Sequence, residues 1–323
     1  MSKNVKKIVL LYNQYIFYKG ELMGGFEAEG EGGYWESDQV AKLMAQNDSK
    51  SKNMHGIKPI IEEDNNNYSI KAHAKVNIFL KITGHKDGYH TLLSRFMRVE
   101  SLYDTITFVP YKCDTFTLEG CDGVPLESNT IYKAYKALSD HPADLDILEF
   151  FNTHKVLVTK RIPSQAGLGG GSSDAAAFML LLKEVCNLPL STQELAKMGS
   201  SIGADIPFFI YNYPSANVSG FGEKVKPFDE EALDIELYTP NIGCNTALVY
   251  KTFKENLLKD VSVCSFFGWD DIDSKTLLAS NSDPIALNDL YNAALLAYPA
   301  LAEVAKEGWY FSGSGSTFFR IKS

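Results

Sequence analysis

The alternation of apolar and polar residues becomes regular only after the first fifth of the chain. Residues 69–83 alternate as a pair of strands would, and residues 94–110 form further strand-like runs rich in Val, Ile, Thr and Phe. Helices are predicted at residues 129–138, 173–187, 191–202, 248–257 and 284–297, and strands at 156–159, 236–239 and 318–321. Ser191 and Glu194 have the spacing of a capping box. This mixture predicts an α+β fold, with two lobes.

The first 67 residues follow a different pattern. Residues 7–12 are a candidate strand and residues 34–45 a candidate short helix, with a glycine-rich run at 20–33 between them. The stretch from 47 to 67 is polar and low in complexity, which is typical of a solvated linker. We therefore expect an N-terminal extension at 1–67, an N-terminal lobe at 68–225 and a C-terminal lobe at 226–323.

Composition narrows the class of protein. The 323 residues are 45% hydrophobic and 22% charged, as in a globular protein of one or two domains. The five cysteines are scattered and never spaced as Cys-x-x-Cys, so they predict neither a disulfide framework nor a zinc site, and a reducing cytoplasm is expected. The longest apolar run, residues 175–182, is too short to span a membrane. A net charge of −9 disfavours binding to nucleic acid, which leaves a small molecule as the expected partner; the oligomeric state is left open.

The strongest chemical signal is a glycine-rich loop between a predicted strand and a predicted helix. It reads Pro163-Ser-Gln-Ala-Gly-Leu-Gly-Gly-Gly-Ser-Ser-Asp-Ala-Ala176. Backbone N–H groups in such a loop can approach phosphate oxygens, and the N-terminus of the following helix adds partial positive charge. No lysine follows the glycines, so the loop is not a Walker A motif. The alternative is a flexible turn capped by Ser172 or Ser173.

Three motifs in order along the chain resemble those of the GHMP kinase family. The glycine loop is similar to the family's Pro-x-x-x-Gly-Leu-Gly-x-Ser/Gly-Ser-Ser motif. Ala74-Lys75-Val76-Asn77 is similar to its N-terminal motif, and Ser312-Gly-Ser-Gly-Ser-Thr317 to its C-terminal glycine motif. The resemblance covers about residues 69–323 and implies a lobe like domain 2 of ribosomal protein S5, then a ferredoxin-like lobe, with the active site between them. Residues 1–67 depart from the family pattern.

The resemblance also implies catalytic roles. Gly203-Ala-Asp-Ile-Pro207 is similar to a family element whose aspartate is the catalytic base, which gives that role to Asp205. Lys75 would keep that aspartate ionised and stabilise charge as the acceptor hydroxyl loses its proton. From the residues alone, each assignment has an alternative. Asp205, which precedes a strand-like apolar run, is also compatible with a helix cap or a structural hydrogen-bond acceptor. Lys75, in an alternating strand, is also compatible with a cation that faces solvent.

A fourth element points to one branch of the family. Asp87-Gly-Tyr-His90 resembles the element with which that branch contacts a cytosine, by stacking through Tyr89 and hydrogen bonding through His90, and Tyr250 would stack on the other face of the base. The branch uses ATP to phosphorylate the 2-hydroxyl of 4-diphosphocytidyl-2-C-methyl-D-erythritol in non-mevalonate isoprenoid synthesis. Taken alone, Gly-Tyr-His is also compatible with a turn that carries a surface aromatic residue.

The resemblance assigns the remaining site residues to nucleotide, substrate and metal. ATP and Mg²⁺ are the implied cofactors, and Ser173 is the nearest candidate for a magnesium ligand. The ATP-binding residues would be Asn129 and Lys160 near the adenine, together with Pro163, Ala166, Gly167, Leu168, Gly169, Gly170, Gly171, Ser172 and Ser173. The substrate would contact Asn77, Tyr89, His90, Tyr250, Gly313, Ser314 and Gly315.

Two other functions share part of this pattern. Another GHMP kinase, acting on mevalonate, homoserine or a sugar, would have the glycine loop but would need no cytosine clamp. A nucleotide-binding module without catalysis would keep the loop and lack Lys75 or Asp205, and both residues are present.

Overall fold

The computed structural model describes residues 10–12, 15–18, 21–25, 58–86, 89–112, 114–141, 145–257, 266 and 268–322. The chain divides into two compact units. Nearly all described residues belong to the second unit, which is formed by residues 56–261 and 269–323. In the first unit, β1 (Leu10–Tyr12), β2 (Tyr15–Tyr18) and β3 (Glu21–Gly25) pair into a small antiparallel sheet. The strand predicted at 7–12 is partly described as β1, whereas the helix predicted at 34–45 lies outside the described residues.

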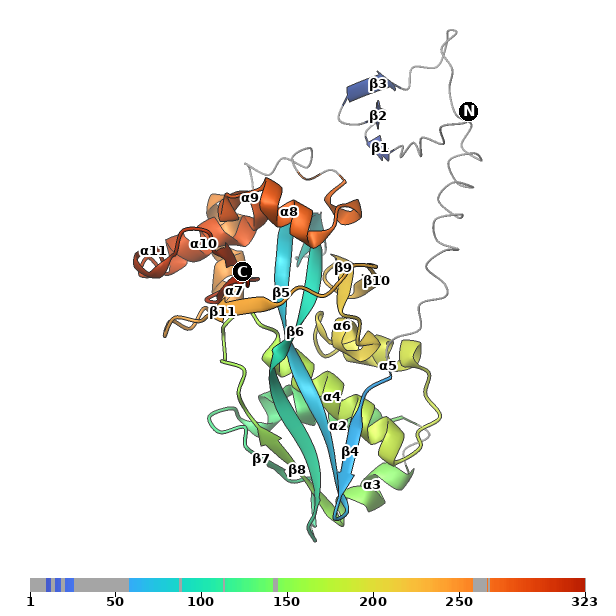
Figure 1. The fold of residues 1–323 in the computed structure, drawn as a ribbon. Helices are drawn as coiled ribbons and strands as arrows, with labels where there is room; N and C mark the ends of the chain where they lie inside the picture. Colours follow the sequence, from blue (N-terminus) through green and yellow to red (C-terminus); the bar gives the residue numbers. More distant parts are fainter. Residues whose placement is uncertain are drawn as a thin grey trace. The chain divides into compact units, whose positions relative to one another are not determined.

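The second unit is built on two long antiparallel strands, β5 (Asn67–Lys86) and β6 (Tyr89–Pro110). In Figure 1 they run side by side from the end of the sheet near α3, past α2 and α4, to the region of α8. The main sheet has the order β10-β9-β6-β5-β4, and β7 and β8 extend it beside β6. Its other strands are β4 (Ile61–Asp64), β7 (Leu118–Glu119), β8 (His154–Thr159), β9 (Ser215–Gly220) and β10 (Lys224–Pro227). The pattern at 69–83, expected to be a pair of strands, is therefore one continuous strand.

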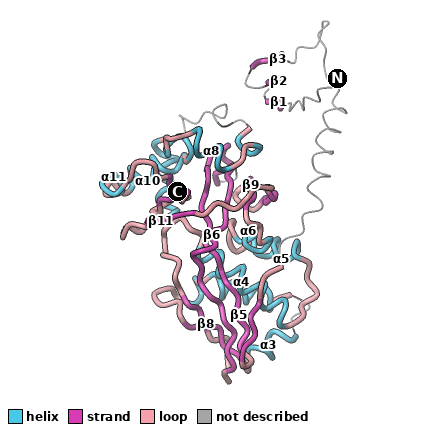
Figure 2. Tube along the Cα trace, in the orientation of Figure 1, coloured by secondary structure: helices cyan, strands magenta, loops and turns pink. Residues whose placement is uncertain are grey.

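Helices cover the main sheet, as the cyan and magenta segments of Figure 2 show. The central one, α4 (Gly170–Val185), packs against β5 and β6 and is buried along most of its length, because Ala175 to Leu182 are all apolar. The other helices of this lobe are η1 (Leu126–Ser128), α2 (Thr130–Ser139), α3 (Leu145–Phe151), α5 (Thr192–Ser200) and α6 (Ile206–Tyr211). The capping box predicted for α5 is present: Glu194 N–H donates to Ser191 Oγ, and Ser191 N–H donates to the Glu194 carboxylate.

A smaller antiparallel sheet forms the rest of the unit, with β11 (Ile235–Tyr238), β13 (Phe318–Ile321) and β12 (Tyr310–Phe311) in that order. The helices here are α7 (Thr246–Asn256), η4 (Trp269–Asp271), α8 (Ser274–Ser280), α9 (Pro284–Leu287), α10 (Asp289–Ala297) and α11 (Leu301–Val304). The helix predicted at 284–297 is broken at Asn288. Its side chain accepts from Leu290 N–H to cap α10 and donates to the carbonyls of Phe311 and Gly313.

Strand β5 contributes to both apolar cores of the unit. Ile70 and Ala72 belong to one core, whereas Ala74 and Val76 belong to the other. The change of core falls at a bulge between His73 and Ala74, where pairing jumps from Tyr103 to Val99 and the extra residues lie on β6. Because successive side chains of a strand point to opposite faces, the buried side chains of Lys75 and Asn77 project opposite to the second core.

The polar stretch assigned to the linker contains a strand of the main sheet. Ile61 to Asp64 form β4 and pair with β5, joined to it by a two-residue turn in which Asn65 and Asn66 have φ of 49° and 63°. Asparagine tolerates this left-handed conformation, which suits tight hairpin turns. The boundary expected at residue 68 was therefore wrong: the compact unit begins at Gly56. The polar composition of this stretch suggested a linker because three of the four β4 residues are exposed, and their side chains are polar.

Truncation tests where the second compact unit begins. Deleting residues 1–57 leaves β4 in place, so the thermal midpoint of the main unfolding transition should change little. Deleting residues 1–66 removes four cross-strand pairs, each worth about 0.2–1 kcal/mol, and should lower the midpoint by several degrees. Both truncated proteins should keep their catalytic activity, because no predicted site residue lies before residue 75. Equal midpoints for the two deletions would show that β4 adds no stability.

Candidate active site

The three predicted motifs meet at one buried hydroxyl. Ser312 Oγ donates to the carbonyl of Gly167 at 2.9 Å and accepts from the backbone N–H of Asn77 at 3.3 Å. The loop is held at two further points, since Thr317 N–H donates to Ala166 O and Lys75 N–H donates to Leu168 O. The N-terminal, glycine-loop and C-terminal motifs, far apart in sequence, thus form one backbone cluster.

Glycine is required where these segments approach most closely. Gly167 has φ of 73°, and a Cβ there would lie 2.1 Å from the carbonyl oxygen of Ser312. Gly169, the residue before α4, has φ of 72°, and its Cβ would meet the ring of Phe209 at 2.9 Å and Lys75 Cε at 3.3 Å. The loop can therefore lie against both the C-terminal motif and Lys75 only because these positions carry no side chain.

Lys75 is the most deeply buried cation of the site, with a side chain 5% exposed. Its Nζ donates to Asn77 Oδ1 at 2.5 Å, lies 3.5 Å from Asp205 Oδ2 and sits 4.4 Å from the centre of the Phe96 ring. Burial lowers the pKa of the Lys75 ammonium, and the negative charge of Asp205 opposes part of that change. Lys75 thus faces Asp205 and does not point to solvent.

Asp205 lies at the N-terminus of a helix and not, as expected, before a strand. The apolar run after it forms α6, which begins with Pro207 in its first turn, a position that proline tolerates. The Asp205 side chain makes no capping hydrogen bond, is 31% exposed and lines the same cavity as Lys75. The interpretation of Asp205 as a cap does not hold, and its carboxylate remains available to a ligand.

A cavity of about 990 Å³ joins these groups. The predicted site residues that line it are Lys75, Asn77, His90, Lys160, Pro163, Ala166, Gly167, Leu168, Gly169, Gly170, Gly171, Ser172, Asp205, Tyr250, Gly313 and Ser314. At one side, the rings of His90 and Tyr250 are stacked with centroids 5.7 Å apart. Burial raises the pKa of the Tyr250 hydroxyl, so this aromatic residue is neutral. The side chain of Tyr89 is outside the described part of the structure.

Three predicted residues are placed elsewhere. Ser173 is buried, and its hydroxyl donates to the carbonyl of His73, away from the cavity. Asn129 caps α2 by accepting from Ile131 N–H, and its neighbour Thr130 lines the cavity instead. Gly315 is not among the lining residues, and its backbone N–H donates to Ser312 O.

Helix α7 supplies cavity residues that the sequence analysis missed. Thr246 hydrogen-bonds Ser314 through their hydroxyls at 2.9 Å, and Lys251 and Lys254 line the cavity beside Tyr250. The signal was present, because residues 246, 250 and 254 recur every four positions and share a helix face. The other unpredicted lining residues are Leu80, Leu92, Phe96, Ile162, Ser164, Gln165, Ala204, Phe221, Ala247 and Leu290.

Lys160 reaches the cavity from a buried cluster of charges. Its ammonium is bound to the carboxylates of Asp104 and Asp174, both almost fully buried. Burial, together with the charge of Asp104, raises the pKa of Asp174 to about 7 even though Lys160 opposes the change. Two carboxylates thus share one cation. At neutral pH this cluster costs folding stability, because Asp174 is buried next to the charge of Asp104.

Comparisons with known proteins show the family to which the chain belongs. The model of the GHMP kinases N-terminal domain matches residues 129–213. A protein of Sulfurovum sp. (strain NBC37-1) named 4-diphosphocytidyl-2-C-methyl-D-erythritol kinase is 66% identical over 255 residues, which cover 79% of this chain and 99% of that protein. One with the same name from Sulfurimonas denitrificans is 49% identical over 78% of this chain and 96% of its own length.

Solved structures show the same fold. A crystal structure of 4-(cytidine 5'-diphospho)-2C-methyl-D-erythritol kinase superposes with a TM-score of 0.61 at 28% identity, covering 79% of this chain and 90% of that one. A mevalonate kinase, at 16% identity and a TM-score of 0.53 over 79% of this chain and 91% of its own, shares the fold alone. This chain belongs to the GHMP kinases and, within them, to the family of 4-diphosphocytidyl-2-C-methyl-D-erythritol kinases. The expected two-lobed α+β fold is confirmed.

The raised pKa of Asp174 makes a prediction about stability and pH. In the unfolded chain this carboxyl has its ordinary pKa of 3.8, so between that pH and about 7 the native state binds more protons. Stability contributed at this site should therefore fall as pH rises through this window. Asp174→Asn, which cannot ionise, should flatten the pH dependence of the denaturant midpoint there and gain on the order of a few kcal/mol at pH 8. An equally steep profile in the variant would exclude Asp174 as its source.

Proposed function

We propose that this protein transfers the γ-phosphoryl group of ATP to the 2-hydroxyl of 4-diphosphocytidyl-2-C-methyl-D-erythritol, a step of non-mevalonate isoprenoid synthesis. The observation that carries the proposal is the pairing of a buried Lys75 with a partly exposed Asp205 in a cavity that the glycine loop also lines. Such a pairing places a cation and a base where an acceptor hydroxyl would meet the terminal phosphate. The names of the relatives supply the substrate.

The roles of the residues follow from charge and position. Asp205 accepts the proton of the hydroxyl, and Lys75 stabilises the oxygen as it becomes negative. The backbone of the loop from Gly167 to Ser172 and the N-terminus of α4 bind the phosphates. His90 and Tyr250 contact the cytosine ring, and Lys160 lies toward the adenine.

Magnesium would enter with ATP. The described residues contain no group of three or more His, Cys, Asp or Glu side chains that could hold a metal ion. This fits Mg²⁺, which commonly binds substrate phosphates, waters and only one or two protein oxygens. Ser172 lines the cavity and Ser173 does not, so Ser172 is the better candidate ligand. The ion would neutralise charge on the phosphates.

We place the enzyme in the cytoplasm, with a small molecule and not a nucleic acid as its partner. Cys121, Cys186 and Cys244 are free thiols, which is consistent with a reducing compartment. No helix in the described ranges has the length and apolar character needed to cross a bilayer. The net charge of −9 disfavours binding to nucleic acid.

The assignment is tested most directly by substrate choice. ADP release should be measured in a coupled assay with the cytidyl substrate, mevalonate and homoserine in parallel. Turnover with the cytidyl substrate alone is the expected result. Equal turnover with mevalonate would reduce the assignment to a GHMP kinase of unspecified substrate, and no turnover with any acceptor would favour a binding module.

Asp205→Asn tests the catalytic base. The amide cannot accept the proton, so turnover should fall by about two to four orders of magnitude, while the dissociation constant for ATP stays near that of the wild type. Asp273→Asn is the matched control: Asp273 caps α8 by accepting from Thr276 N–H, a bond that asparagine can also make. A folded Asp205→Asn protein with near wild-type turnover would remove Asp205 from the mechanism.

Tyr250→Ala tests the cytosine slot. Stacking of a base on an aromatic ring is worth about 1–3 kcal/mol, so the KM for the cytidyl substrate should rise roughly 5- to 150-fold while that for ATP changes little. Tyr250→Phe keeps the ring and should behave like the wild type. His90→Ala should also raise the KM for this substrate selectively, because it removes a hydrogen bond to the base. Equal losses for both substrates, or full activity on methylerythritol phosphate without the cytidyl group, would contradict the slot.

A further inference from the structure

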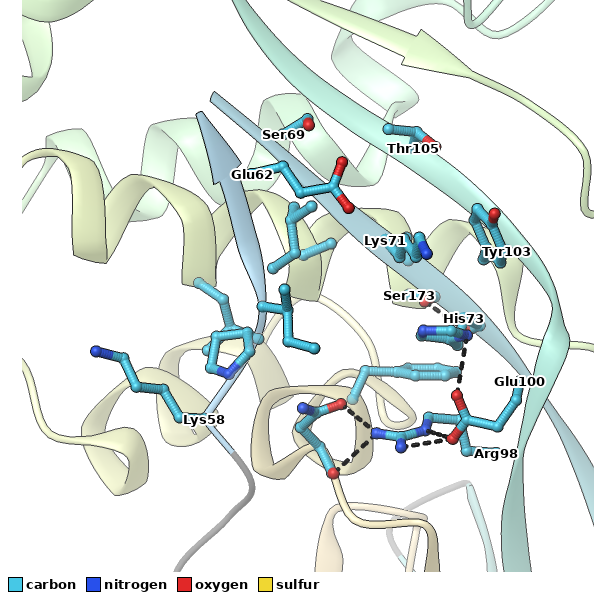
Figure 3. Close-up of a pocket in the computed structure, with 18 of the residues that line it drawn as sticks. Lys58, Glu62, Ser69, Lys71, His73, Arg98, Glu100, Tyr103, Thr105 and Ser173 are labelled. Carbon is cyan, nitrogen blue, oxygen red and sulfur yellow. Dashed lines mark hydrogen bonds and ion pairs between the residues drawn. The ribbon is translucent and has the colours of Figure 1, made fainter. Parts of the chain in front are cut away.

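A second cavity, of about 500 Å³, lies at the edge of β5 beside α4 and α6. Figure 3 shows Lys71 and His73 on β5 next to Tyr103 on β6, with Ser173 near His73 and with Lys58 and Glu62 on the other side. His73 and Tyr103 are cross-strand partners whose rings lie 5.4 Å apart. None of the groups to which we assign a catalytic or binding role lines this cavity, which we call the β5-edge pocket.

The β5-edge pocket carries an excess of positive charge. Four of its lining residues are Lys or Arg and only two, Glu62 and Glu100, are acidic. Glu100 is already engaged, because its Oε1 accepts from Arg98 Nε at 2.6 Å. Arg98 also donates to the backbone and side-chain oxygens of Asn212, so it acts as part of the wall.

Two of the cations remain available to a ligand. Lys71 Nζ and the Arg161 guanidinium carbon lie 4.9 Å and 5.1 Å from the centre of the Tyr103 ring. Neither forms an ion pair with a carboxylate among the described residues. The Lys71 ammonium and the Arg161 guanidinium are exposed and border one concave site, and such a pair of cations suits the oxygens of a phosphate group. Ser69 and Thr105 add hydroxyl groups to the same wall.

The β5-edge pocket also borders the first turn of α4, which follows the glycine loop. Ser173, the fourth residue of α4, lines it and donates to the carbonyl of His73 at 2.7 Å, whereas its neighbour Ser172 lines the catalytic cavity. Phe209 forms part of its wall and touches the position of Gly169 on the other side. One strand, β5, supplies Lys71 and His73 to the pocket and Lys75 to the catalytic cavity.

We propose that the β5-edge pocket is a second ligand site, distinct from the catalytic cavity, which binds a small phosphate-bearing anion through Lys71 and Arg161. Its volume admits inorganic phosphate or a small phosphate ester, and the two share the chemistry that these cations recognise. The proposal is independent of the proposed function, because it concerns residues that take no part in the phosphoryl transfer.

Histidine resonances provide a test that does not depend on activity. In the full chain with ¹³C-labelled histidine, His73 reports on the β5-edge pocket and His90 on the catalytic cavity, and His73→Gln and His90→Gln assign the two signals. The catalytic cavity is kept filled with a saturating non-hydrolysable ATP analogue and Mg²⁺. Inorganic phosphate, glycerol phosphate and, at matched ionic strength, sodium chloride are then titrated. The two phosphate arms distinguish a free ion from an ester as the ligand.

We expect a saturable shift of the His73 signal with at least one phosphate compound and not with chloride, while the His90 signal stays fixed. Lys71→Gln with Arg161→Gln should abolish the shift, and Lys71→Gln alone should weaken it. Lys155→Gln is the matched control, because Lys155 also lies over a tyrosine ring, that of Tyr111 at 4.5 Å, but outside the pocket. The proposal is overturned by a shift that is linear, equal with chloride or retained in the double variant, or by movement of the His90 signal alone.

Discussion

The active site depends on the burial of one ammonium group. Removing the Lys75 charge from water is costly, and the cost is offset only if strong partners surround it. Those partners are the Asn77 carbonyl, the Asp205 carboxylate and the face of the Phe96 ring. Asn77 is fixed in turn, since its Nδ2 donates to Ser94 Oγ at 2.9 Å. The same desolvation strengthens the field that Lys75 exerts on Asp205, so the constraint on the fold is also the source of its chemistry.

The burial of Lys75 explains why segments so distant in sequence must interlock. Gly169 leaves room for the Lys75 stem, Gly167 lets the loop touch Ser312, and Ser312 hydrogen-bonds the strand that carries Asn77. Asn288 fixes the C-terminal motif, because its Nδ2 donates hydrogen bonds to the carbonyls of Phe311 and Gly313. Most of these contacts are to backbone atoms, and the hydroxyl of Ser312 joins the loop at Gly167 to the strand at Asn77.

The sequence predicted what local chemistry determines. The glycine loop could be located because a phosphate cradle needs particular residue types, whereas Lys75 and Asp205 were located by the resemblance to the family. Most predicted residues line one cavity. Tertiary contacts decided the rest. The turn at Asn65 and Asn66 converts an apparent linker into a hairpin, and the direction of the Ser173 hydroxyl depends on the carbonyl of His73, one hundred positions earlier. Neither partner can be recognised from periodicity.

Strand β5 contributes both to the apolar cores and to the active site. Ile70 and Ala72 before the bulge belong to one core, Ala74 and Val76 after it belong to the other, and Leu80 and Ile82 belong again to the first. Side chains alternate along the strand, so Lys75 points away from Ala74 and Val76 and lies against Gly169 of the loop. A bulge sets the direction of a side chain through backbone geometry, and rigid strands on both sides preserve that direction. The β6 strand pairs with β5 along nearly its whole length, which fixes the bulge from the second side. The position of Lys75 is thus determined by the register of two long strands, and a one-residue slip of that register would turn its side chain into the core.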